Sequence, residues 1–96
     1  MNQPPELLDG AKVVRWSEID GRHRPTGGCR QIVNGVLQGQ VAGVAICQYE
    51  GESAYYLFGC DPEWNTVTDT WHESLNDALE QAELEYEGVS GTWDVV

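Results

Sequence analysis

The feature that most constrains the fold is an amphipathic segment that begins at Ser74 and ends at Gly88. Its apolar side chains recur at helical spacing and, at ~100° per residue, fall on one stripe ~80° wide. This stripe consists of Leu75, Ala78, Leu79, Ala82 and Tyr86. Ser74 and Asp77 have the spacing of a capping box, and Gly88 suits a left-handed stop. The pattern predicts a C-terminal helix over about 74–87.

The opposite face of this predicted helix carries carboxylates and no balancing cation. Its acidic residues are Glu73, Asp77, Glu80 and Glu87, with Glu83 at the flank. Like charges three or four residues apart destabilise a helix by about 0.2–0.5 kcal/mol per pair. Leu84 lies among these acids, opposite Leu75. An apolar residue ringed by carboxylates is the pattern of an anchor for a cationic protein surface, and the alternative is a solvated acidic face with one exposed leucine, which is common in soluble proteins.

Charge is distributed unevenly along the chain, whose net charge is -11. All five basic residues lie in the first thirty positions, and they are Lys12, Arg15, Arg22, Arg24 and Arg30. From Gln31 onward only acids contribute formal charge. A field of this sign repels nucleic acid and anionic membranes and speeds encounter with cationic proteins. We expect no nucleic-acid or membrane partner.

Two arrangements could compensate the acidic helix face. In the first, the basic segment that contains Arg22, Arg24 and Arg30 folds back onto the helix. In the second, a basic partner protein docks on that face. The sequence leaves both open.

Upstream of the helix the sequence predicts an antiparallel sheet. Apolar or alternating runs predict a three-strand meander over about 42–71, with strands at residues 41–49, 54–60 and 66–71. A further strand is predicted at 13–19, where the alternation is too irregular to indicate the buried face. Asn34-Gly35 between short apolar arms predicts a hairpin at 31–38, with an irregular excursion as the alternative. The result is an α+β fold with three to five strands packed by one helix.

A single domain over 11–96 is predicted, preceded by a loose polar arm at residues 1–10 that only Leu7 and Leu8 could tie down. Residues 61–65 are expected to form a tight connection, in which Pro62 restrains the backbone and Asn65 tolerates a left-handed conformation. No basic region followed by an apolar stretch precedes the domain, and no apolar run is long enough to span a bilayer. We therefore expect a cytoplasmic protein.

A second candidate site lies where the last predicted strand meets the helix. Asp69 and His72 could form an acid/base pair there, and Trp64 and Trp71 could line a ligand pocket. The alternatives are a structural hydrogen bond at the corner and aromatic packing under the helix.

The cysteines and histidines do not form a recognisable metal or cofactor motif. Zinc sites show closely paired ligands, and no such pair occurs in this sequence. Cys29, Cys47 and Cys60 are interpreted as buried reduced thiols, with a redox or nucleophilic role as the alternative. We expect neither metal nor cofactor.

These observations favour a small, acidic, non-enzymatic protein that binds a basic partner protein, in the manner of an inhibitor or immunity protein. The predicted contact residues are Glu73, Asp77, Glu80, Leu84 and Glu87. The alternative is a small-ligand binder or enzyme that uses Trp64, Asp69, Trp71 and His72. A third hypothesis is a homodimer formed through an uncapped sheet edge.

Overall fold

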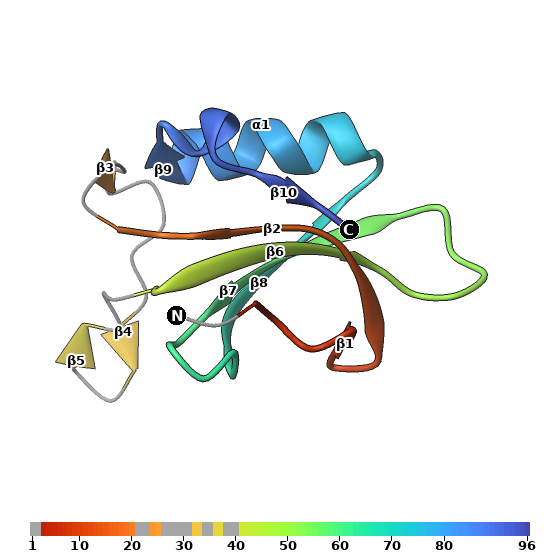
Figure 1. The fold of residues 1–96 in the computed structure, drawn as a ribbon, viewed down its shortest axis with the longest axis horizontal. Helices are drawn as coiled ribbons and strands as arrows, with labels where there is room; N and C mark the ends of the chain where they lie inside the picture. Colours follow the sequence, from red (N-terminus) through yellow and green to blue (C-terminus); the bar gives the residue numbers. More distant parts are fainter. Residues whose placement is uncertain (1–2, 21–23, 26–31, 34–35, 38–40) are drawn as a thin grey trace.

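A curled antiparallel sheet packed by one helix forms the molecule (Figure 1). The computed structural model describes residues 3–20, 24–25, 32–33, 36–37 and 41–96. The main sheet has the strand order β1-β2-β6-β7-β8, and β10 pairs with β2 beside β1. Its strands are β1 (Leu7–Leu8), β2 (Ala11–Glu18), β6 (Gly43–Gln48), β7 (Tyr55–Cys60), β8 (Thr66–His72) and β10 (Asp94–Val95). The predicted α+β fold is confirmed, and the sheet curls into a half-barrel.

The sheet carries an apolar core on each face. The helix α1 (Leu75–Glu85) covers one face, where the buried cluster contains Val41, Val44, Ile46, Leu57, Ala78, Ala82 and Val89. The other core contains Leu8, Ala11, Val13, Ala45, Cys47, Phe58, Cys60 and Trp64. Strand β6 is buried on both sides, as its continuous run of small and apolar residues predicts.

An irregularity in β2 explains why its alternation is hard to interpret. The register with β6 shifts between Val13 and Arg15, which is the signature of a β-bulge. Val13 and Trp16 therefore contact the same core although they are three positions apart, while Val14 packs on the helix side. The extra residue reverses the inward and outward positions of the strand.

Part of the predicted loose arm belongs to the sheet. Leu8 is buried and pairs with Ala11 across a two-residue turn in which both Asp9 and Gly10 have positive φ. Asp-Gly is a favoured pair for such a turn because its type I′ form needs positive φ at both central positions. The Thr66 hydroxyl donates to Asp9 Oδ2 at 2.7 Å, which joins this hairpin to the strand at the other end of the order.

The helix begins where the sequence predicts and ends earlier. Ser74 is the N-cap, and its hydroxyl accepts a hydrogen bond from the Asp77 backbone N–H at 3.1 Å. After Glu85 the chain becomes extended as β9 (Tyr86–Glu87), because this segment pairs with β3 (Arg24–Pro25). Gly88 has the predicted left-handed backbone, with φ of 101°, but it precedes the 3₁₀ helix η1 (Val89–Gly91) rather than ending α1.

The antiparallel strand pairing of the hairpin predicted at 31–38 is confirmed. β4 (Ile32–Val33) and β5 (Val36–Leu37) form an antiparallel pair separate from the main sheet. The predicted turn residues Asn34 and Gly35 lie outside the described residues.

Candidate functional site

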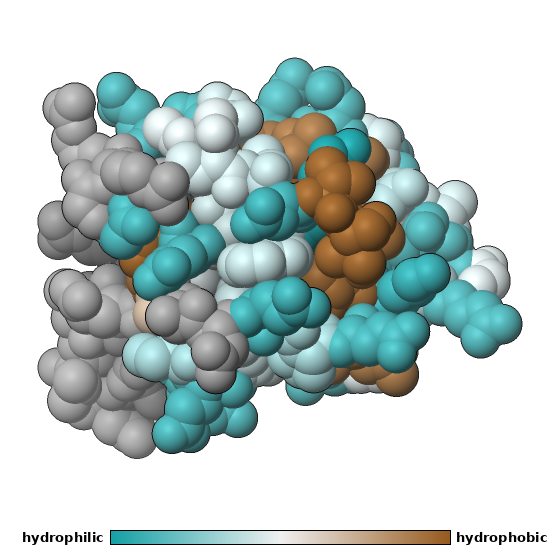
Figure 2. All heavy atoms as spheres, in the orientation of Figure 1, coloured by the Kyte–Doolittle hydropathy of each residue, from teal (hydrophilic) through white to brown (hydrophobic). Residues whose placement is uncertain are grey.

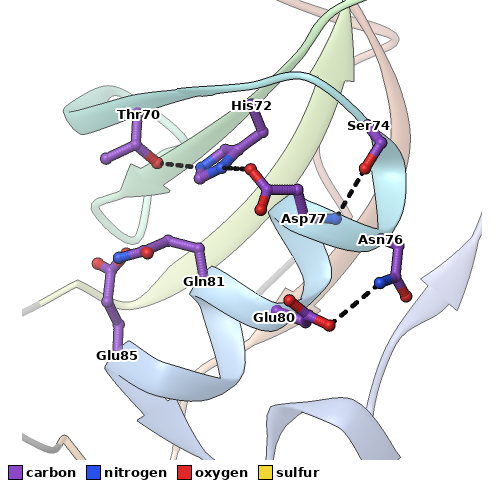
Figure 3. Close-up of polar contacts among 8 residues, drawn as sticks. All are labelled: Thr70, His72, Ser74, Asn76, Asp77, Glu80, Gln81 and Glu85. Atoms are coloured by element: carbon purple, nitrogen blue, oxygen red, sulfur yellow. Dashed lines mark hydrogen bonds and ion pairs between the residues drawn. The ribbon is translucent and has the colours of Figure 1, made fainter.

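A chain of side-chain hydrogen bonds joins strand β8 to the helix α1 (Figure 3). His72 Nδ1 lies 3.0 Å from Asp77 Oδ2, and His72 Nε2 lies 2.7 Å from Thr70 Oγ1. An ionised carboxylate can only accept, so Nδ1 donates to Asp77 and, in the neutral ring, Nε2 accepts from the Thr70 hydroxyl. His72 is only 7% exposed, so this network holds a buried imidazole between β8 and α1.

The prediction that Asp69 pairs with His72 is wrong. Successive residues of a strand point to opposite faces, so positions 69 and 72 cannot share a side. Asp69 is in register with Phe58 of the core opposite α1, and its side of β8 is exposed. His72 faces α1, where Asp77 supplies the carboxylate.

The four residues of the predicted ligand pocket do not come together. Trp64 is buried in the core opposite α1 and packs edge-to-face on Trp16, with ring centroids 6.0 Å apart. Trp71 is 56% exposed, and His72 lies on the other side of the sheet. In the connection at 61–65 the residue with positive φ is Trp64, at 64°, and not Asn65, which would tolerate it.

Asp61, three positions before Trp64, holds this connection in place. The Asp61 carboxylate accepts hydrogen bonds from the backbone N–H groups of Glu63 and Asn65, both at 2.9 Å. Its other oxygen accepts from the Asn65 side-chain amide at 3.1 Å. These bonds, those from Asn65 first among them, lower the pKa of Asp61 because they favour its charged form.

The residues predicted to contact a partner lie on α1 and in the segments just before and after it. Glu73, Asp77, Glu80, Leu84 and Glu87 are all exposed, and Leu84 has 64% of its surface accessible. A shallow depression of about 310 Å³ gathers three of them with one residue of β8 and one further residue of α1. Its lining consists of His72, Asp77, Glu80, Gln81 and Leu84.

Gln81 and Glu85 were not singled out in the sequence analysis. Glu85 is only 6% exposed, and Gln81 Nε2 donates to its Oε2 at 2.9 Å. Position 85 continues the helical spacing of the buried Ala78 and Ala82, and this spacing is the signal that could have identified it. The side-chain amide of Gln81 therefore lines the depression and also donates a hydrogen bond to the buried carboxylate of Glu85.

Several acids of this region have partners within the chain. Glu83 accepts hydrogen bonds from the backbone N–H groups of Gly88 and Ser90, at 2.8 and 2.9 Å, and so caps the start of η1. Glu80 accepts from Asn76 Nδ2 at 3.1 Å.

The basic segment approaches the acidic face at its far end. Arg24 is in register with Glu87 through the pairing of β3 and β9, so the backbone of this segment runs beside the C-terminal end of α1. Arg22 and Arg30 lie outside the described residues. At the other end, no Lys or Arg among the described residues lines the depression.

A larger hollow of about 450 Å³ lies elsewhere, near the turn between β1 and β2, and includes Leu7, Lys12 and Tyr49. On the face drawn in Figure 2, apolar surface gathers over β10 and the C-terminus, where Val95 and Val96 are exposed. Neither feature adjoins the network of His72. The depression beside α1 is the place where predicted contact residues and an ordered polar network meet.

The two described cysteines, Cys47 and Cys60, are buried thiols of low reactivity. Cys47 and Cys60 are buried, and burial is the main cause that raises the pKa of each thiol to about 12. Both therefore remain protonated near neutral pH, where a nucleophilic role needs the thiolate. Cys29 lies outside the described residues.

Comparison with family models, curated proteins and solved structures finds no match for this chain. Within the described ranges, no helix has the length and apolar character needed to cross a membrane. In the same part of the chain, no three His, Cys, Asp or Glu side chains converge as metal ligands. Fold and site together define a small α+β protein with a half-barrel sheet and an acidic depression between its edge strand and its helix.

Proposed function

We propose that this chain is a non-enzymatic binding protein that docks a basic surface of a partner protein in the depression between β8 and α1. One observation carries the proposal: the exposed Leu84 lies in the same depression as Asp77 and Glu80, and no described Lys or Arg lines that depression. The strongly acidic charge of the chain favours encounter with a cationic partner.

The lining supplies complementary contacts for a lysine or arginine side chain. The aliphatic stem of such a side chain packs on Leu84, and its charged end lies between the carboxylates of Asp77 and Glu80. An exposed ion pair contributes only about 0–1 kcal/mol. The apolar contact with Leu84 and the removal of water around it must therefore supply much of the affinity.

The network of His72 prepares the carboxylate of Asp77 for this role. One oxygen of Asp77 accepts from His72, which fixes the side chain in one position. The carboxylate retains acceptor sites for an incoming cation. Less side-chain entropy is then lost when a partner binds.

A pair of charge reversals tests the proposal. The probe is an acetylated tetralysine amide, titrated calorimetrically at low salt. Glu80→Lys should weaken binding about tenfold, or about 1.4 kcal/mol, because it replaces an attraction by a repulsion. Glu63→Lys is the matched control: it makes the same change in net charge at an exposed site in the 61–65 connection.

Leu84→Ala gives a second readout that does not change the charge. It should weaken binding of the tetralysine probe while leaving the salt dependence unchanged, because it removes only the apolar contact. Equal effects of Glu80→Lys and Glu63→Lys would show that the probe senses the overall charge alone, and would refute the proposed site.

A further inference from the structure

We infer that the partner presents this basic surface as an extended segment, which adds to the sheet along the free edge of β8. This inference rests on the proposed function and names how the partner is recognised. It would make the binding mode β-strand addition, in which main-chain hydrogen bonds provide affinity and alternate side chains provide specificity.

The first observation is the position of β8 in the sheet. It is the last strand of the order, and within the described residues it pairs with β7 alone. An edge strand presents backbone N–H and C=O groups that can pair with another chain. The Asp9 hairpin contacts its first residue, Thr66, so the edge from Val67 to His72 is the part that a partner strand could use.

The second observation is what flanks this edge on each side of the sheet. On one side, Val67 and Trp71 are 39% and 56% exposed, with the exposed Asp69 between them. On the other side, the edge leads to His72 and the depression beneath Asp77 and Glu80. A strand added here would place alternate side chains on these two surfaces.

These surfaces specify the chemistry of the added strand. Side chains on the Trp71 side would be apolar opposite Val67 and Trp71, and cationic opposite Asp69. A cationic side chain on the helix side would reach the depression. The fitting occupant is an extended segment with apolar residues opposite Val67 and Trp71, a basic residue opposite Asp69, and a basic residue on the helix side.

A second copy of this chain fits the edge poorly. Symmetric antiparallel pairing of two β8 strands about their middle residue would place the two Asp69 side chains opposite each other, and like charges in that position are destabilising. Each copy also has a net charge of -11. Charge complementarity therefore favours the basic segment over self-association.

A synthetic hexapeptide, acetyl-Lys-Val-Lys-Lys-Thr-Val-amide, is the probe. In antiparallel pairing its residues lie opposite His72, Trp71, Thr70, Asp69, Thr68 and Val67, in that order. Two further peptides carry one backbone N-methyl group, on the third or on the fourth residue, both of which are lysine. An added strand directs the N–H groups of neighbouring residues to opposite sides, so only one of these two groups faces β8.

Strand addition predicts that one N-methyl peptide binds at least tenfold more weakly than the parent, while the other keeps its affinity within about twofold. The parent peptide should also slow hydrogen exchange of backbone amides between Val67 and His72. Peptide composition and charge are identical in the two methylated forms, so their difference reports the backbone alone.

Equal affinities of the two methylated peptides would overturn strand addition. If the Glu80→Lys substitution still weakened the binding of both methylated peptides, the proposed function would stand without strand addition. Failure of the parent peptide to bind would also overturn strand addition, and the proposed function would fall with it only if acetylated tetralysine amide failed to bind as well. Dimerisation of the free protein with protection of the β8 amides would show that a second copy occupies the edge, and would overturn the inference.

Discussion

At the scale of single residues, the partner of a side chain depends on which face of its element it occupies. His72 and Asp69 are close in sequence, but strand alternation directs them to opposite sides of the sheet. Asp77 is farther along the chain, yet the turn into α1 brings its carboxylate to His72. Two residues of one strand can therefore pair through their side chains only if they are an even number of positions apart and so share a face.

Asp77→Ala should lower the free energy of unfolding by about 1–3 kcal/mol, because it leaves the buried N–H of His72 without its acceptor. Asp77→Asn keeps an acceptor oxygen and should recover most of this loss. Urea unfolding near neutral pH measures both. Glu80→Ala, on the same helix but exposed, should stay within about 0.5 kcal/mol. Equal losses for Asp77→Ala and Glu80→Ala would mean that the network contributes nothing.

Cys47 and Cys60 should resist Ellman's reagent in the native protein and react after denaturation. A Cys29→Ser variant leaves only these two thiols for the measurement. Because burial raises the pKa of each to about 12, deprotonation favours the unfolded chain, whose thiols titrate near 9. Their contribution to stability is complete below about pH 9 and is lost as pH rises toward 12. Rapid labelling of the native variant at pH 8 would contradict this account.

At the scale of elements, local signals in the sequence predict more than long-range pairing does. The start of α1 follows from Ser74 and the apolar stripe, and both are visible in the sequence. Its end does not, because Tyr86 and Glu87 leave the helix to pair with β3, about sixty residues earlier in the chain. The Asp9-Gly10 turn is a local signal that the sequence analysis overlooked.

Gly59→Ala should destabilise the sheet by about 1–3 kcal/mol through overpacking. A Cβ at this position would lie 3.0 Å from Val41 Cγ2 and closer still to Thr68 Oγ1. Thermal or urea unfolding measures the effect, and Thr68→Ala in the same chain should restore part of it. Gly91→Ala is the control because nothing lies within 4 Å of its added Cβ. A Gly59→Ala variant as stable as Gly91→Ala would show that the strands adjust without cost.

At the scale of the whole molecule, the uneven charge of the sequence supports the proposal of a cationic partner but does not give the shape of the site. Exposure of Glu80 and Leu84 follows from helical spacing. The depression that Glu80 and Leu84 line is also lined by His72 and Gln81, and the position of these two residues depends on how α1 crosses the sheet. Sequence patterns are local, and they leave this crossing and the position of β8 at the edge undetermined.

The most direct test of the acidic docking site is a map of backbone amide chemical shifts during titration with acetylated tetralysine amide at low salt. We predict that the largest changes lie between Asp77 and Leu84 and near His72, and that added salt removes them. Changes of similar size around the exposed acids Glu50, Glu52 and Glu63 would contradict the account, because they would show that the peptide responds to net charge and recognises no particular surface.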